Sequence, residues 1–451
     1  MSLSLLLLLL LLVFSSEASH FMGTVMTYYP KDTNADGSVT VVLRYKLGYH
    51  VSCKSDTWSC LSRNCGTEVS IQQNIIDSES DDWCQKEGIS TRLVPNNTQF
   101  QPLLIGGSWV TTINNIVSWR AVTLVELRMR SDTSKANTSP QTTILPLVRV
   151  PSNCQRDFNL LAFDPDGDNV QCRYGNTSLS ECNPCTPPSV LNLSSSCTLS
   201  FSPTSSSNEG VYAVQLVMED FPTHTITLTQ TNGAQEVKTN SDALSKIPVQ
   251  FAFSVDPEVP SCTEGLYLPK FLPPTPDNRA QLYTPVNHSL EILIKAETKN
   301  TTISELLFSG PYNVTNTTLA AGEYILSWTP SQNEDGESHP ICFVVQAISS
   351  STVKYHSELR CVMVTVGNAP TTSPPPVVTP TVDTTSAVEQ LRRVVVGMMI
   401  KISSSSPLSE DYIRNTIMQQ LKDELIRRGL TSSSYITLLV SSETNTSRPG
   451  G

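Results

Sequence analysis

The sequence predicts a mainly β protein built from tandem antiparallel β-sandwich (Ig/cadherin-like) domains that are disulfide-linked, with a small C-terminal α+β segment. Short apolar runs alternate with polar residues at period two and end at Gly, Pro, Asn or Ser, which is typical of half-buried strands. A strand–loop–strand pattern occurs twice, at 199–220 and 326–347. The chain also holds 12 Cys, an even number that favours disulfides. Many short strands at close spacing indicate sandwiches.

Composition limits the function classes. A length of 451 residues predicts several domains. The 41 Asp and Glu outnumber the 30 Lys and Arg, which gives a net charge of -11 and excludes a phosphate-backbone binder, so no nucleic acid partner is expected. Only 16% of residues are charged, and Ser, Thr and Asn carry the polarity instead, as on an extracellular surface.

The first residues predict the compartment. Leu5 to Phe14 is an unbroken apolar run, too short for a membrane helix but typical of a signal-peptide core. Ser16 and Ala18 are small residues that suit cleavage before Ser19. The alternative is a buried N-terminal helix. We expect a signal peptide at 1–18, secretion to the extracellular space, and no membrane span, since no later stretch is long and apolar enough.

Residues 19–135 are predicted to form a Cys-containing β-rich domain of no named family. It carries Cys53, Cys60, Cys65 and Cys84, for which three pairings are possible. The segment Asp32-Thr33-Asn34-Ala35-Asp36-Gly37 matches the first half of an EF-hand calcium loop through Asp32, Asn34 and Asp36. Leu43 stands where the bidentate Glu belongs, so a hairpin turn closed by Asp-Gly is the favoured interpretation.

The next two domains are placed at 141–257 and 262–367. Leu160-Leu161-Ala162-Phe163-Asp164-Pro165-Asp166-Gly167-Asp168-Asn169-Val170 is followed by Phe201-Ser202-Pro203, Glu209-Gly210-Val211-Tyr212 and Met218-Glu219-Asp220. This pattern resembles the cadherin-like repeats of the dystroglycan type, which implies Ig-like sandwiches of adhesive extracellular proteins. The resemblance is clear in 141–257 and loose in 262–367, where Lys295-Ala296-Glu297-Thr298 replaces the Asp-rich turn.

The Asp-rich turn is the strongest candidate site. Asp164, Asp166 and Asp168 alternate around Gly167, and their oxygens are the ligands that calcium prefers. Asp220 adds a fourth carboxylate if its strand lies beside the turn, as the family resemblance implies. The alternative is an Asp-rich turn that needs no metal. Calcium is the one cofactor that the sequence suggests.

The remaining cysteines are expected to be structural. Cys342 and Cys361 lie on the last two strong strands of the third domain, so we expect them to form a disulfide. Cys182-Asn183-Pro184-Cys185 has redox-motif spacing, but neither a βαβ unit nor a helix N-terminus surrounds it. Bridges within one group are favoured instead: Cys154, Cys172, Cys182, Cys185, Cys197 and Cys262.

Three segments follow the sandwiches: a Pro/Thr-rich linker at 368–388, a strand–helix–strand module at 389–441 that resembles half of a SEA-type or ferredoxin-like module, and a disordered tail at 442–451. Acceptor sequons for N-glycosylation occur throughout the chain, at Asn96, Asn137, Asn176, Asn192, Asn287, Asn300, Asn313, Asn316 and Asn445.

The sequence favours a binding or adhesion protein over an enzyme. Its six His are scattered without zinc spacing, and it has no nucleophile elbow and no phosphate-binding Gly loop. The expected partner is an extracellular protein or glycan. One alternative is the truncated or shed ectodomain of a single-pass membrane receptor. Another is a secreted hydrolase, whose carboxylate pair no motif would reveal.

Overall fold

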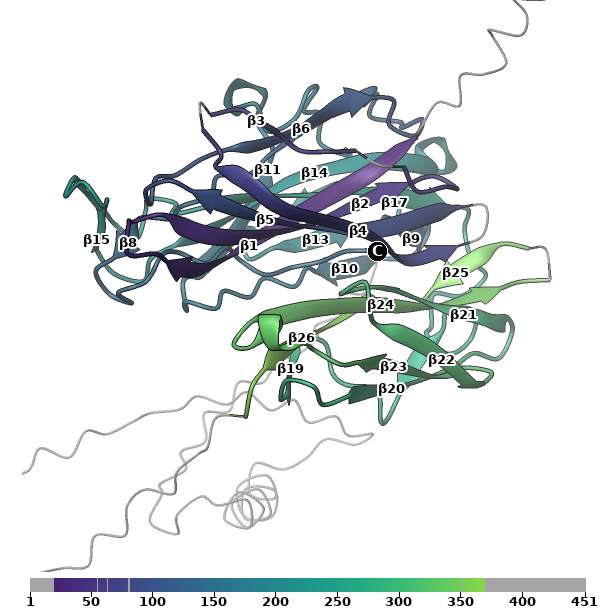
Figure 1. The fold of residues 1–451 in the computed structure, drawn as a ribbon. Helices are drawn as coiled ribbons and strands as arrows, with labels where there is room; N and C mark the ends of the chain where they lie inside the picture. Colours follow the sequence, from purple (N-terminus) through teal and green to yellow (C-terminus); the bar gives the residue numbers. More distant parts are fainter. Residues whose placement is uncertain (1–19, 55, 63, 80–81, 351, 370–451) are drawn as a thin grey trace, which may run out of the picture. The chain divides into compact units, whose positions relative to one another are not determined.

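The computed structural model describes residues 20–369 except 55, 63, 80–81 and 351. The predicted signal peptide, almost all of the linker, the SEA-like module, the tail and Asn445 lie outside these residues. The described part is a mainly antiparallel β protein, as predicted, with 26 strands and three short 3-10 helices (Figure 1).

One large sheet holds eight strands. Its first half comes from the N-terminal part of the chain, in β1 (Phe21–Thr33), β2 (Val39–Tyr49), β4 (Thr67–Glu79) and β5 (Trp83–Val94). Its second half comes from β9 (Leu147–Pro151), β11 (Asn169–Tyr174), β14 (Gly210–Phe221) and β17 (Lys246–Asp256). The strand order is β11-β14-β17-β1-β2-β5-β4, and β9 adds a parallel pair with β17.

This sheet runs across the predicted boundary between 19–135 and 141–257. Strand β1 pairs antiparallel with β17, with Val25 opposite Val249. Gly23 makes the junction possible, because its φ is +131° and a Cβ there would lie 2.0 Å from the Gln250 carbonyl oxygen. The two segments therefore share one continuous sheet. Strand alternation marks the strands but does not show which edges join.

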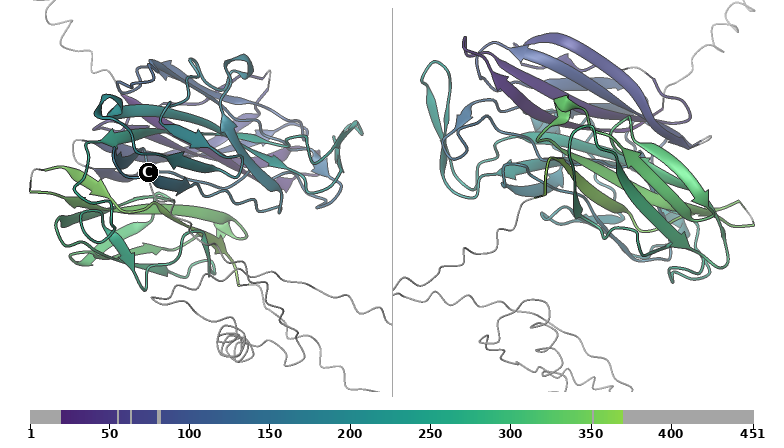
Figure 2. Two further views of the ribbon diagram at one scale, coloured as in Figure 1. Left: turned by 180° about the vertical axis from the view of Figure 1, so that it is seen from behind. Right: turned by 60° about the horizontal axis from the view of Figure 1, so that its bottom comes forward.

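The second half of the sheet completes an Ig-like sandwich. A three-stranded sheet covers it, with the order β10-β13-β12. Phe158, Phe201 and Phe253 meet between the sheets. The N-terminal half has its own second sheet, with the order β3-β6-β7, and Figure 2 shows these layers from two further sides. The strand bounds are β3 (Ser59–Cys60), β6 (Pro102–Gly107), β7 (Ser118–Val122), β10 (Arg156–Asn159), β12 (Leu191–Leu193) and β13 (Thr198–Phe201).

The third sandwich has two sheets of its own, β18-β20-β23-β22 and β19-β26-β24-β21, with β25 paired to β24. Its core contains Phe271, Trp328 and Phe343. The bounds are β18 (Lys270–Leu272), β19 (Ala280–Thr284), β20 (Leu290–Glu297), β21 (Thr302–Ser309), β22 (Thr315–Ala320), β23 (Glu323–Trp328), β24 (Ser338–Ile348), β25 (Lys354–His356) and β26 (Arg360–Val366).

The predicted repeat corresponds to one structural unit in both sandwiches. A strand (β13 or β23) leads through a single 3-10 turn (Ser206–Asn208 or Gln332–Glu334) into a long central strand (β14 or β24). An early strand also pairs parallel with the last strand in each case, β9 with β17 and β19 with β26. The shared topology explains why the short sequence pattern recurs.

All 12 cysteines lie among the described residues and form six disulfides. Cys342 and Cys361, opposite each other on β24 and β26, are joined as the strand positions predict. The other pairs are Cys53–Cys84, Cys60–Cys65, Cys154–Cys262, Cys172–Cys197 and Cys182–Cys185. Among the described residues, no helix has the length and apolar character needed to cross a bilayer.

Candidate functional site

The Asp-rich turn leads directly into β11. The Asp164 side chain organises it, because Asp164 Oδ1 accepts hydrogen bonds from the backbone N–H groups of Asp166 (2.9 Å) and Asp168 (3.1 Å). Gly167 adopts a φ of +84°, which an L residue rarely does. The turn ends beside the last residues of β14, since Asn169 pairs with Phe221 and Val170 with Asp220.

Three of the four predicted calcium ligands converge. Asp164, Asp168 and Asp220 each place a carboxylate oxygen within 4.8 Å of the others, and they form the one such group of three among the described residues. Asp166 lies outside the group, since its Oδ2 accepts a hydrogen bond from the Thr138 backbone N–H at 2.7 Å. Asp166 is thus the one predicted ligand that this structure does not bring into the group.

A segment that sequence reasoning did not include completes the cluster. Arg130, on the short strand β8 (Met129–Arg130), forms a bidentate ion pair with both oxygens of Asp168. Its Nη2 also lies 2.7 Å from Asp132 Oδ2. Asn137 accepts a hydrogen bond from Arg130 at 2.6 Å and donates one to Asp220 Oδ2 at 2.7 Å. Arg130 and Asn137 lie some thirty positions before the turn, and no local pattern marks them as part of this cluster.

Burial sets the electrostatics of the site. Asp220 is fully buried, and Asp164 is 9% exposed. Burial, followed by the neighbouring carboxylates Asp220, Asp168 and Asp166, raises the pKa of Asp164 to about 8. Burial also raises the pKa of Asp220 to about 6, against hydrogen bonds from Ser245 and Asn137. The cluster thus binds a proton, or another positive charge, far more readily than free aspartates do.

One atom is left without a partner. Asp164 Oδ2 is buried and accepts no hydrogen bond, whereas Asp164 Oδ1, Asp168 and Asp220 are all engaged. An unpaired buried carboxylate oxygen is costly, and a calcium ion would satisfy it while using Asp168 and Asp220 as further ligands. The donor set therefore fits a hard cation.

The second predicted calcium segment is a turn. Asp32, Asn34 and Asp36 lie at the β1–β2 hairpin, where Gly37 N–H donates to the Asn34 carbonyl and Ser38 N–H donates to Asp36 Oδ1. The Ser38 hydroxyl hydrogen bond, with its backbone N–H, lowers the pKa of Asp36. The side chains of Asn34 and Asp36 both hydrogen-bond to Ser38 and so close the hairpin.

The sequons differ in accessibility. Asn137 is fully buried, and its Nδ2, the atom that carries an N-linked glycan, donates to Asp220. The expectation that Asn137 is glycosylated is therefore incompatible with this structure. The other described sequon asparagines are exposed, namely Asn96, Asn176, Asn192, Asn287, Asn300, Asn313 and Asn316.

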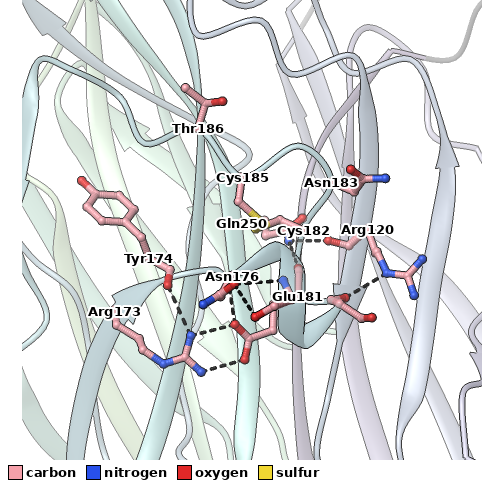
Figure 3. Close-up of a disulfide and its surroundings, with 12 residues drawn as sticks. Arg120, Arg173, Tyr174, Asn176, Glu181, Cys182, Asn183, Cys185, Thr186 and Gln250 are labelled. Atoms are coloured by element: carbon pink, nitrogen blue, oxygen red, sulfur yellow. Dashed lines mark hydrogen bonds and ion pairs between the residues drawn. A yellow bond between two sulfur atoms is a disulfide. The ribbon is translucent and has the colours of Figure 1, made fainter.

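The Cys182–Cys185 disulfide closes a loop held on several sides (Figure 3). Arg173 forms a bidentate ion pair with Glu181 just before it, with both N–O distances at 2.7 Å. Gln250 donates to the backbone carbonyls of Arg120 and Glu181, so the loop is fixed to β17 and β7. These contacts are structural ones, in agreement with the expected role of the cysteines.

Comparisons with known proteins give distant matches. No family model matches the chain. It is 22% identical over 382 residues to integrin beta-like protein C of Dictyostelium discoideum, and 21% identical over 374 residues to integrin beta-like protein B of the same organism. Both alignments cover 76% of this chain but only 19% and 18% of the relatives, so the chain spans about a fifth of their length.

Solved structures with detectable similarity include Drosophila N-cadherin EC1-4, at 9% identity over 76% of this chain and 92% of that chain, with a TM-score of 0.18. Human protocadherin-24 EC1-2 matches at 13% identity over 52% of this chain and 100% of that chain, with a TM-score of 0.16. TM-scores this low do not establish a shared fold. The Ig-like assignment therefore rests on the strand order and strand pairing of this chain.

Proposed function

We propose that this protein is a secreted, N-glycosylated extracellular protein of the adhesion type, which works by binding an extracellular protein or glycan. The observation that carries the proposal is the pairing of every cysteine in six disulfides, since such frameworks form and persist outside the reducing cytosol. Distant similarity to integrin beta-like proteins over most of the chain supports the adhesion role. The dystroglycan-type cadherin-like relationship of 141–257 belongs to the same proposal.

The fold suits a rigid binding scaffold. The continuous eight-stranded sheet ties the N-terminal half to the Ig-like sandwich, and Cys154–Cys262 links that sandwich to the segment that leads into the third. A rigid scaffold loses little conformational entropy when it binds, so its loops and sheet faces present a pre-formed surface. The proposal assigns no catalysis to the chain, and a screen of the purified protein against glycan and ester substrates should find none.

Calcium at the Asp cluster is the second part of the proposal. Asp164, Asp168 and Asp220 would hold the ion, and Asp164 Oδ2 is the oxygen that gains most. A bound calcium ion supplies two positive charges that neutralise converging carboxylates. The three carboxylates then fix the turn before β11 to the end of β14, and Asn137 ties the preceding segment to the same point.

Adhesion is tested with beads coated with the secreted, glycosylated protein and mixed with live cells. We expect binding of the beads to cells that is lost when the protein is reduced and denatured before coating. Beads coated with the native protein that bind no more cells than the denatured control would contradict the adhesion proposal.

Calcium is tested by thermal unfolding with and without chelator. We expect calcium to raise the melting temperature of the wild type but not of Asp164→Asn. Without calcium, Asp164→Asn should melt close to the wild type at neutral pH, because a pKa of about 8 keeps Asp164 largely protonated. Asp242→Asn is the matched control, since Asp242 caps an exposed turn through Thr239. Equal melting of the wild type in calcium and chelator would refute the site.

A further inference from the structure

Arg130 is buried in an unusual way. Its side chain is 1% exposed, and its guanidinium contacts are to acidic or amide oxygens of the cluster. Two N–H groups contact Asp168 and two contact Asp132. Nη1 also lies 3.7 Å from Asp166 Oδ2. A buried guanidinium with this many charged acceptors acts as the internal counter-charge of the cluster.

The same carboxylate serves both the guanidinium and the candidate cation site. Asp168 belongs to the group with Asp164 and Asp220, and both of its oxygens are hydrogen-bonded to Arg130. A calcium ion on that group would share Asp168 with a full positive charge only a few ångströms away. Two like charges at that separation in a buried site repel strongly, because little water screens them.

We propose that Arg130 competes with calcium for the acidic cluster and thereby sets the calcium affinity of the site. This inference rests on the calcium site of the proposed function and deepens it. In low calcium, Arg130 neutralises Asp168 and holds the cluster together. When calcium binds, the carboxylates become its ligands, and the ion pair between Asp168 and Arg130 weakens.

The competition connects the site to a second segment. Arg130 opens a tight loop, in which its N–H donates to the Lys135 carbonyl at 2.9 Å and its carbonyl accepts from Ser134 at 3.1 Å. Arg130 also pairs with Leu228 on β15 (Ile226–Thr229), which forms a hairpin with β16 (Gln235–Lys238). A change in the ion pair between Asp168 and Arg130 therefore affects the 130–135 loop and the β15–β16 hairpin.

The third sandwich provides an internal comparison. Its corresponding turn after β20 carries Thr298 and Thr301, whose hydroxyl groups donate to the backbone carbonyls of Leu266 and Tyr267. The acidic cluster with its arginine partner thus occurs at the turn of one Ig-like sandwich, and the equivalent turn of the other sandwich uses hydroxyl groups instead. This agrees with a role of the Arg130 guanidinium in balancing the charge of the carboxylates.

The test compares calcium affinity among variants of the full secreted chain by isothermal titration calorimetry. Arg130→Gln keeps a polar side chain but removes the charge, and we expect it to bind calcium at least about tenfold more tightly than the wild type. Arg128→Gln is the matched control, because Arg128 is also a buried arginine but pairs with Glu126 and Glu236. We expect its calcium affinity to equal that of the wild type.

The outcomes separate this inference from the calcium proposal. Equal affinities of wild type and Arg130→Gln, both binding, would overturn the competition and leave the calcium site standing. Binding by Arg130→Gln but not by wild type would support the competition and refute calcium use by the native chain. No binding by either would overturn both. If Arg130→Gln fails to fold, the calcium affinity of Arg130→Lys tests the competition instead. A single ammonium cannot span both oxygens of Asp168, so a Lys variant that binds calcium less tightly than wild type would contradict the inference.

Discussion

Asn114 offers a sharp test of how the N-terminal half is joined to the Ig-like sandwich. It lies between β6 and β7, and its side chain pairs with the backbone of Ala213 on β14 as another strand would. Asn114 Nδ2 donates to the Ala213 carbonyl at 2.8 Å and to the Thr186 carbonyl at 2.7 Å, and Asn114 Oδ1 accepts from the Ala213 N–H at 3.0 Å. Ala213 is fully buried, so water cannot replace these bonds.

The magnitude follows from the groups left unpaired. Asn114→Ala strands the N–H and the C=O of Ala213, and an unsatisfied buried polar group costs about 1 to 3 kcal/mol. Thr186 is exposed, so its carbonyl can accept a hydrogen bond from water instead and adds little to this loss of stability. The free energy of unfolding should therefore fall by about 2 to 6 kcal/mol, well above the roughly 0.5 kcal/mol of a surface substitution.

The assay is urea unfolding of the disulfide-intact protein, followed by tryptophan fluorescence, with Asn240→Ala as the control because Asn240 is exposed. Asn114→Asp keeps the acceptor but loses the donor, and it should be destabilised at least as much. An Asn114→Ala variant as stable as Asn240→Ala would refute the view that this side chain joins the two halves.

Gly23→Ala should lower the free energy of unfolding by at least about 3 kcal/mol, because its Cβ would meet the β17 backbone at a positive φ, and thermal unfolding measures this. Removing Cys154–Cys262 by two Ser substitutions should cost about 5 kcal/mol and removing Cys60–Cys65 about 2 kcal/mol, since the loops span 108 and 5 residues; equal losses in urea unfolding would contradict the loop-entropy account. Burial, with Arg149 and Arg156 nearby, holds the pKa of His356 well below its usual range. As the pH falls, His356 therefore binds a proton in the unfolded chain while it stays neutral in the folded chain. The stability that His356 contributes is therefore present above about pH 6.5 and lost below it, and His356→Gln should lose less stability than wild type between about pH 7 and about pH 5.

Much of the fold could be predicted from local sequence. The alternating strands, the repeated strand–turn–strand unit and the Cys342–Cys361 bridge all follow from patterns of a few residues, because strand periodicity and facing positions are local properties. The joining of β1 to β17 was not predictable in this way. It depends on which of several sheet edges meet, and the single clue, Gly23, is one glycine among 20.

The candidate site was predicted in part for the same reason. Asp164 and Asp168 share a turn, and Asp220 joined them through a family resemblance that places its strand nearby. Arg130 and Asn137 come from outside the predicted domain and reach the cluster only through tertiary packing. Asn137 also matched a sequon, whose three-residue pattern carries no information on burial.

Peptide mapping of the secreted protein under non-reducing conditions identifies its disulfide bridges, free thiols and glycans together, and so decides whether the chain matures outside the cytosol. We predict six bridges with the pairing seen in the structure, no free thiol, and an Asn137 that carries no glycan. Free sulfhydryls throughout a chain that stays inside the cell would contradict an extracellular binding protein built on these sandwiches.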